Sequence, residues 1–342
     1  MSFAGHIGDD AAMEIPRPDR ERFATKLKSL RALNGMMTQE ELAQDSGVDV
    51  GLIQNYEQGK SLAKLDAIEK LAEALGASPA GFQAVELRDL LFSDDFDEVG
   101  VVAQLLFQIA DTYDLKPYFK DGVMGVFSNG GYIEYAIAEW CKLLEKEQQD
   151  MRHAFEEGIS DEEHAERKAV MDKSAEELKR FQLGYDGPFD KADYPSRPPR
   201  LGETLKRLRL ASRLTQSDLA DAADVSVFTV RAYEQGKRAP NAVQRRAIAK
   251  ALGVPVETLV DFGIEDPNEA FHFLMEMAHI YYLNPKCIGD EIVLCEYELY
   301  KEGLPVRPSL DKLFGDWYFA LVELNETGDK AAYQDWQDHY EG

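Results

Sequence analysis

The sequence predicts a mainly α-helical protein in which a small helical domain and an α+β accessory unit each occur twice. The strongest observation is an internal repeat: TQEELAQDSGVDVGLIQNYEQGK, from Thr38 to Lys60, recurs as TQSDLADAADVSVFTVRAYEQGK, from Thr215 to Lys237. The two blocks align without a gap. Helical hydrophobic spacing around both blocks, and a hairpin pattern after each, complete the prediction. We infer an internal duplication.

Changes in composition divide the 342 residues into six predicted segments. These are an N-terminal tail (1–18), the first helical domain (19–82), the first accessory unit (83–155), a linker that is helical and then rich in Pro and Gly (156–198), the second helical domain (199–262) and the second accessory unit (263–342).

Local signals predict the first two helices of each helical domain. Leucines and other apolar residues recur at three- and four-residue spacing after Phe23 and after Leu201, which is typical of an amphipathic helix. Thr38 and Thr215 are suited to cap the next helix. An acidic residue stands three positions after each of them, Glu41 and Asp218, as in a capping box.

The turn and the third helix are predicted in the same way. Gly47 and its counterpart Asp224 tolerate the left-handed backbone that a tight turn needs. Asp49 and Ser226 are natural caps for a third helix. Two sets of residues provide the buried faces of the third and fourth helices: Ile53, Tyr56, Leu65, Ile68, Leu71 and Leu75 in the first copy, and Val230, Tyr233, Val243, Ile248 and Leu252 in the second.

Each accessory unit begins with an apolar helix, VGVVAQLLFQIADTY in the first and EAFHFLMEMAHIYY in the second. Asp121-Gly122 and Gly289-Asp290 then mark the tight turns of two short hairpins. Amphipathic helices follow around Trp140 and Trp317, and a last one ends near Trp336. We expect each unit to form a small α+β subdomain.

The pattern TQxxLA followed by I/V-x-x-YExGK resembles the XRE (Cro and lambda-repressor-like) family of helix-turn-helix domains. It occurs twice, although the two stretches together cover less than half of the chain. The resemblance implies a DNA-binding protein of the kind found in bacteria and mobile elements. In this family the third helix enters the major groove, and the second helix and the following loop hold phosphates.

The resemblance also implies which residues contact DNA. Gln39 and Gln216 would touch the backbone or an edge base. The base-reading positions are Val50, Gly51, Gln54 and Asn55 in the first copy, and Val227, Phe228, Thr229, Arg231 and Ala232 in the second; the phosphate contacts are Lys60, Lys237 and Arg238. Gly51 and Ala232 offer no side-chain hydrogen bond, so specificity depends on the other side chains.

The charge distribution separates the two domains. The whole chain carries a net charge of -25, which repels DNA. Residues 17–82 hold 9 basic and 10 acidic side chains, net -1, and residues 197–261 hold 12 and 7, net +5, so the remainder carries -25 + 1 - 5 = -29. The second domain is therefore the better candidate for DNA, and the acidic accessory units are candidates for a protein partner.

We therefore expect a transcriptional regulator, a repressor, that binds specific double-stranded DNA. Two linked and unlike domains predict two unlike half-sites, read by a monomeric pseudo-dimer or by a homodimer. The alternative is an acidic protein-interaction or antitoxin-like module that uses helix-turn-helix folds to bind a protein.

The sequence lacks the motifs that would indicate other classes of protein. The sequence shows no phosphate-binding glycine loop and no nucleophile elbow, so we expect no enzyme. Its three cysteines are scattered, without CxxC or Cys/His spacing, so we expect reduced thiols and neither a metal nor a cofactor. Neither a signal peptide nor a membrane-spanning segment is apparent, so we expect no membrane contact and a cytoplasmic location.

Overall fold

The computed structural model describes residues 20–77, 96–156, 158–184, 200–264, 267–296 and 308–341, together with Pro79, Phe82, Leu87 and Leu91. The predicted tail, 1–18, and the Pro- and Gly-rich part of the predicted linker lie outside the described residues. The architecture is mainly helical, with one small antiparallel sheet, as predicted.

The first helical domain contains four helices around its own core. They are α1 (Arg20–Leu33), α2 (Gln39–Ser46), α3 (Val50–Glu57) and α4 (Leu65–Leu75). The fully buried side chains include Leu27, Leu42, Ile53 and Leu71, which come from four different helices. Leu65, predicted to face this core, is instead 55% exposed. It is the first residue of α4 and projects beyond the packed face.

The second helical domain repeats this arrangement. Its helices are α10 (Arg200–Ala211), α11 (Gln216–Ala222), α12 (Val227–Glu234) and α13 (Ala242–Leu252), followed by the 3-10 turn η2 (Val256–Leu259). Leu219, Val230, Tyr233 and Ile248 are buried in its core. Val243 is 68% exposed, so the prediction for this residue was wrong too, and again it lies in the first turn of the last helix.

The predicted caps and turns are confirmed. Thr38 and Thr215 each form a capping box with the acidic residue three positions later. Gly47 and Asp224 both adopt the left-handed backbone, with φ of 69° and 53°. Short local signals thus determine where the helices of both domains begin and how the turns are made.

The two accessory units share a single sheet and a single core. Their elements are α7 (Glu98–Tyr113), β1 (Leu115–Lys120), β2 (Val123–Ser128) and α8 (Gly131–Ala154) in the first copy, and α14 (Pro267–Tyr281), β3 (Leu283–Ile288), β4 (Glu291–Glu296), α15 (Asp311–Thr327) and α16 (Lys330–Asp338) in the second. Both predicted hairpins form, and they join into an antiparallel sheet of strand order β1-β2-β4-β3. Both units have the predicted α+β character, and their hairpins share one sheet, because two strands alone leave an unpaired edge.

The join between the hairpins is nearly symmetric. Val126 pairs with Leu294, and each is the fourth residue of its strand, so equivalent residues of the two copies face each other. Gly125 makes this approach possible, since a Cβ there would lie 2.3 Å from the carbonyl oxygen of Leu294. The duplicated units are therefore related by an approximate twofold axis between β2 and β4.

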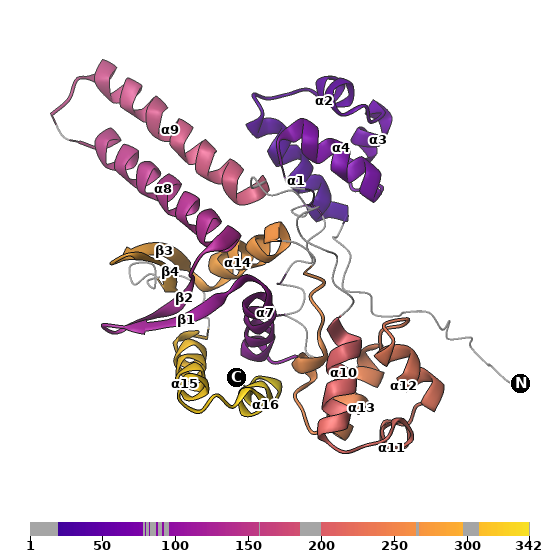
Figure 1. Ribbon diagram of the computed structural model, residues 1–342. Coiled ribbons are helices and arrows are strands. Elements are labelled where there is room, and N and C mark those ends of the chain that lie inside the picture. Colours follow the sequence, from indigo (N-terminus) through magenta and orange to yellow (C-terminus); the bar gives the residue numbers. More distant parts are fainter. Residues whose placement is uncertain are drawn as a thin grey trace, which may run out of the picture.

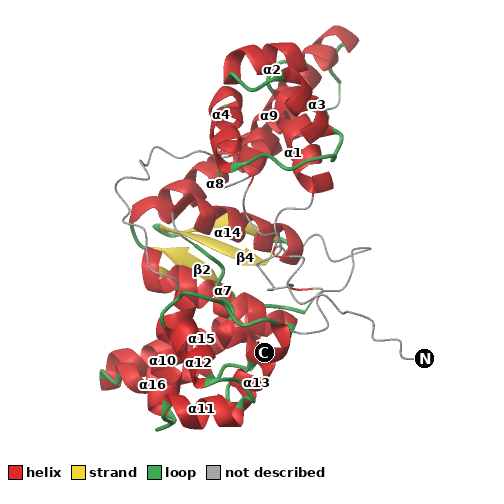
Figure 2. Cartoon of the chain, turned by 90° about the vertical axis from the view of Figure 1, so that its right-hand side faces the viewer, coloured by secondary structure: helices red, strands yellow, loops and turns green. Residues whose placement is uncertain are grey.

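The shared α+β core lies between the two helical domains (Figure 1, Figure 2). Trp140 of α8 and Trp317 of α15 are both buried in it. The helix α9 (Asp161–Gly184) forms a long hairpin with α8, and the turn between the two helices points away from the sheet in Figure 1. Among the described residues, no helix combines the length and the apolar character that a membrane span requires.

Candidate nucleic-acid interface

In the first domain, α3 is the helix that the family resemblance places in the groove. Asp49 caps it: one carboxylate oxygen, Oδ1, accepts hydrogen bonds from the backbone N–H groups of Gly51 (2.9 Å) and Leu52 (3.2 Å). A Cβ at position 51 would lie only 3.0 Å from this oxygen. Gly51 thus leaves room for the cap, which gives it a structural role and leaves no side chain for base reading.

In the second domain, α12 presents larger side chains to solvent. Ser226 caps the helix through the backbone N–H of Thr229 (3.1 Å), and the two hydroxyl groups lie 2.8 Å apart. Phe228, at the position equivalent to Gly51, is 79% exposed. The guanidinium of Arg231 lies 6.0 Å from the centre of its ring. An exposed ring beside an exposed arginine gives this helix a surface that is both apolar and cationic.

A three-residue network fixes the second helix against the third in both domains. In the second, the Glu234 carboxylate accepts hydrogen bonds from Arg209 Nε (2.5 Å) and from Gln216 Nε2 (2.8 Å). Arg209 also donates from Nη1 to the carbonyl of Leu214 (2.7 Å), in the loop between α10 and α11. One buried carboxylate therefore joins α10, α11 and α12.

The first domain has the same network. Glu57 accepts from Arg31 Nε (2.7 Å) and from Gln39 Nε2 (2.6 Å), and Arg31 Nη1 donates to the carbonyl of Met37 (2.5 Å). Gln39 and Gln216 are thus held in place at the first position of their helices. An amide nitrogen has two hydrogens, so each glutamine keeps one donor for a phosphate.

The network keeps its carboxylates ionised. Burial alone raises the pKa of Glu234, but the hydrogen bonds from Arg209 and Gln216, and the charge of Arg209, outweigh it and bring the pKa below the usual 4.5. The pKa of Glu57 is lowered in the same way by Arg31 and Gln39. The pKa of Arg209 is raised, chiefly by its hydrogen bond to Glu234. Each pair is an ion pair at neutral pH, nearly inaccessible in the second domain and partly exposed at Arg31 in the first.

Four residues of these networks, Arg31, Glu57, Arg209 and Glu234, were not predicted from the sequence. A signal existed, since both glutamates lie in the repeated YEQGK block, directly after a buried tyrosine. The arginines were harder to find, because the loop after the first helix is one residue longer in the first copy. Leu52 was also missed; it is 45% exposed on α3 and adds an apolar side chain to that helix.

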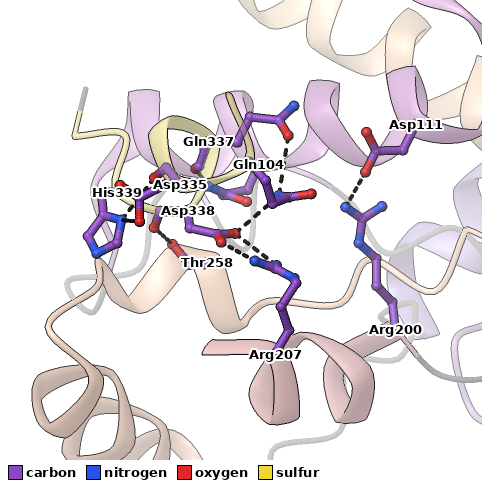
Figure 3. A network of polar contacts seen from close by, with 10 residues as sticks. Gln104, Asp111, Arg200, Arg207, Thr258, Asp335, Gln337, Asp338 and His339 are labelled. Atoms are coloured by element: carbon purple, nitrogen blue, oxygen red, sulfur yellow. Dashed lines mark hydrogen bonds and ion pairs between the residues drawn. The ribbon is translucent and has the colours of Figure 1, made fainter. Parts of the chain in front are cut away.

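The second domain is fixed to the shared core by a dense polar network (Figure 3). Arg207 forms a bidentate ion pair with Asp338, the last residue of α16, with Nη2 2.9 Å from Oδ1. Arg200 pairs with Asp111 of α7 at 2.5 Å, and Thr258 donates to the carbonyl of Asp338 at 2.7 Å. These contacts join α10 and η2 to helices from both accessory units.

The amides of α7 add to this attachment. Gln108 donates through Nε2 to the carbonyl of Val260 (2.8 Å) and accepts at Oε1 from the backbone N–H of Phe262 (3.3 Å). The first domain is attached differently: α1 packs along α9, and Arg180 donates to the carbonyl of Leu75 at 3.3 Å. The two domains are therefore anchored to the core through different elements.

Comparison with protein families agrees with this geometry. A helix-turn-helix model matches residues 27–82, and a second helix-turn-helix domain model matches residues 200–262. The chain carries two helix-turn-helix domains of the XRE, Cro and lambda-repressor-like type. Neither a curated protein nor a solved structure matches the chain significantly. The matched XRE domains point to DNA binding, and none of the matched models is catalytic.

The side chains predicted to touch DNA lie around the second and third helices of each XRE domain. Those that are exposed are Gln54 and Lys60 in the first domain, and Phe228, Arg231, Lys237 and Arg238 in the second. Those that are half-buried are Gln39, Val50, Gly51 and Asn55 in the first domain, and Gln216, Val227, Thr229 and Ala232 in the second. Their contacts with bases and phosphates remain a prediction.

Proposed function

We propose that the protein is a transcriptional regulator, acting as a repressor, that binds specific double-stranded DNA through its XRE domains. The observation that carries this proposal is the surface of α12. Arg231 and Phe228 are exposed on this helix, and Lys237 and Arg238 are exposed just after it. Arginine is suited to read guanine in the major groove, and an apolar ring to contact a thymine methyl.

The network around Glu234 supports the same proposal. It holds α11 and α12 in one arrangement before DNA binds, so these helices lose little conformational freedom on binding. Gln216, held at the start of α11, is placed for a phosphate contact next to the groove. We propose that the second domain supplies most of the specificity.

The first domain is the weaker reader in this proposal. Gly51 stands where the second domain has Phe228, and residues 17–82 carry a net charge of -1 against +5 for 197–261. Gln54 and Asn55 are the side chains of this domain that are suited to hydrogen-bond with adenine. Since the two third helices differ at most positions, we propose two unlike half-sites.

Selection from a random duplex library, with the full chain and at several salt concentrations, tests the proposal. We expect one enriched motif with two dissimilar halves, and affinity that falls steeply with salt. Failure to enrich any motif at low salt would overturn specific DNA binding. Enrichment of a perfect palindrome would instead overturn the assignment of one half-site to each domain.

A second candidate is an acidic, antitoxin-like module that binds a protein partner. It is favoured by the charge outside the two domains, which sums to -29. A chain of this charge attracts basic proteins and is repelled by DNA over long range. The library experiment separates the two candidates, because a protein-binding module enriches no sequence at any salt concentration.

A further inference from the structure

Two cysteines and a glutamate that are far apart in the sequence meet between α8 and β3. The sulfur of Cys141 lies 3.8 Å from that of Cys287 and 3.8 Å from Oε1 of Glu145. The carbonyl of Pro285 is also close to Cys141, at 3.7 Å from its sulfur. Cys141 is buried, whereas Cys287 and Glu145 are exposed, so the cluster opens to solvent on one side.

The three ligand atoms lie within 4.8 Å of one another, and two of the three separations match those around a tetrahedral metal ion. Zinc binds cysteine sulfur at about 2.3 Å and carboxylate oxygen at about 2.0–2.2 Å. A tetrahedral angle then separates two sulfurs by about 3.8 Å, and a sulfur from an oxygen by about 3.6 Å. The observed 3.8 Å for both pairs is close to these values. The third pair, Cys287 and Glu145, lies within 4.8 Å, and movement of the exposed Glu145 side chain can shorten this separation.

The other half of the duplicated core shows that the fold does not require these residues. Cys287 is the fifth residue of β3, and the fifth residue of β1 is Phe119. Cys141 follows Trp140, and Tyr318 follows Trp317. Phe119 and Tyr318 pack against each other with ring centres 5.6 Å apart. At one position of the approximate twofold, aromatic packing fills the space; at the other, two thiols and a carboxylate occupy it.

We propose that Cys141, Cys287 and Glu145 form a binding site for a thiophilic divalent cation, with zinc the best fit and water as the fourth ligand. Sulfur and carboxylate ligands of this kind suit zinc better than magnesium or calcium. Binding releases the two thiol protons to solvent, because the metal coordinates thiolates.

The site has a structural consequence. Cys141 and Glu145 belong to the first copy and Cys287 to the second, so a bound ion links the two halves of the shared core. It also fixes α8, the helix that pairs with α9, against the sheet. The site therefore lies on the path that connects the first XRE domain to the rest of the molecule.

Cobalt binding to the full, reduced chain tests this site. Co²⁺ reports thiolate ligands by its absorption, and Zn²⁺ should then displace it. We expect one cobalt per chain with thiolate-to-metal absorption, and a loss of affinity of about tenfold or more in Cys287→Ser and Glu145→Gln. Cys295→Ser, which changes the remaining cysteine on β4, is the matched control and should bind like the unaltered chain.

Three results would overturn the proposal. They are the absence of thiolate-to-cobalt absorption, an unchanged affinity in both Cys287→Ser and Glu145→Gln, and a loss of binding in Cys295→Ser that equals theirs. Cys287 and Glu145 are exposed, and circular dichroism checks that their variants fold. Zn²⁺ should also raise the melting temperature of the unaltered chain and leave that of Cys287→Ser unchanged. The reductant is present throughout, so disulfide formation between Cys141 and Cys287 cannot be mistaken for metal binding.

Discussion

At the scale of single residues, one buried carboxylate in each XRE domain holds the second and third helices together. Glu234 and Arg209 are both nearly inaccessible, with side chains 5% and 8% exposed. In the first domain Glu57 is equally buried at 3%, but Arg31 is 21% exposed. An arginine left without its glutamate is therefore less hydrated in the second domain than in the first. Loss of the ion pair should lower the free energy of unfolding more in the second domain.

Glu234→Gln should destabilise the second domain by roughly 3 kcal/mol at pH 7, because it leaves Arg209 buried without its counter-charge. The effect depends on pH. Since the pKa of Glu234 is lowered in the folded state, its contribution is complete above the usual 4.5 and is lost as the pH falls through the lowered value. The difference between the two proteins should then shrink below about pH 4.5.

Urea unfolding followed by hydrogen exchange of peptides from 200–262 measures this difference. Glu57→Gln is the matched control in the other domain, and its smaller cost at pH 7 follows from the partly exposed Arg31. The free energies of unfolding of Glu234→Gln and of the unaltered chain should converge as the pH falls. If their difference grew instead, the pKa of Glu234 would not be lowered in the folded state.

Arg231 and Lys237 are both exposed and basic, but the proposed function gives them different roles. Arg231→Ala should relax the preference at one position of the motif and cost about 1–3 kcal/mol there. Lys237→Ala should weaken binding to all sequences alike. It should also lower the slope of log affinity against log salt concentration by about one. Binding to the selected motif and to single-base variants at three salt concentrations measures both. Equal losses across all positions for both variants would refute the separation of roles.

At the scale of elements, the caps of the third helices link stability to the proposed function. Ser226 satisfies the backbone N–H of Thr229 and contacts its hydroxyl, at a helix start that is proposed to enter the groove. Ser226→Ala should lower the stability of the second domain by about 1 kcal/mol. It should also weaken binding to the selected motif, because the first turn of α12 frays.

Ser217→Ala is the control for this prediction. Ser217 is exposed in the first turn of α11, where Thr215 is the cap, so its loss should change stability by less than about 0.5 kcal/mol. Hydrogen exchange of α12 and DNA affinity are the measurements. If Ser226→Ala matched Ser217→Ala in both, the cap would not control the start of the recognition helix.

The sequence predicted elements where local chemistry determines them. Thr38, Asp49 and Asp121-Gly122 each act within a few residues, and the caps and the hairpin that they predict are confirmed. What it missed depends on long-range contacts. The pairing of β2 with β4 and the meeting of Cys141 with Cys287 join different copies, and no spacing in the chain signals either.

The ion pairs fall between these cases. Glu57 lies in a repeated block, so comparison of the two copies contained the signal, but only the folded domain shows that Arg31 and Gln39 share its carboxylate. The base-reading positions came from family resemblance. The structure adds that a Cβ at Gly51 would lie 3.0 Å from the capping oxygen of Asp49, a tight contact that glycine avoids.

At the scale of the whole molecule, duplication has produced one core that carries two XRE domains. The sheet needs both hairpins, so neither copy of the accessory unit has a complete sheet alone. The second domain is attached to elements of both copies through Arg207, Arg200 and Gln108. A chain built in this way presents two XRE domains from a common support.

This attachment leads to a prediction about the spacing of the half-sites. If the domains are held by a common core, inserting five base pairs between the half-sites turns one of them to the opposite side of the duplex, about half a helical turn away. Affinity should fall toward that of a single domain, by about 100-fold or more. Inserting about ten base pairs returns the half-site to the same side of the duplex but moves it by about 34 Å along the axis. Domains held by a fixed core should not reach it there either.

Arg207→Ala removes the bidentate pair with Asp338 and should loosen the second domain from the core. Its affinity for the unaltered site should fall, because the domains are less well arranged for simultaneous binding, while the penalty for the inserted base pairs shrinks. Lys168→Ala, an exposed position on α9, removes the same charge far from this contact and should keep the spacing preference of the unaltered chain. Titration of each protein with duplexes carrying zero, five and ten inserted base pairs measures the effect. Equal binding of the unaltered chain to all three duplexes would mean that its domains reach their half-sites independently, and that the contacts between Arg207 and Asp338 do not set their spacing.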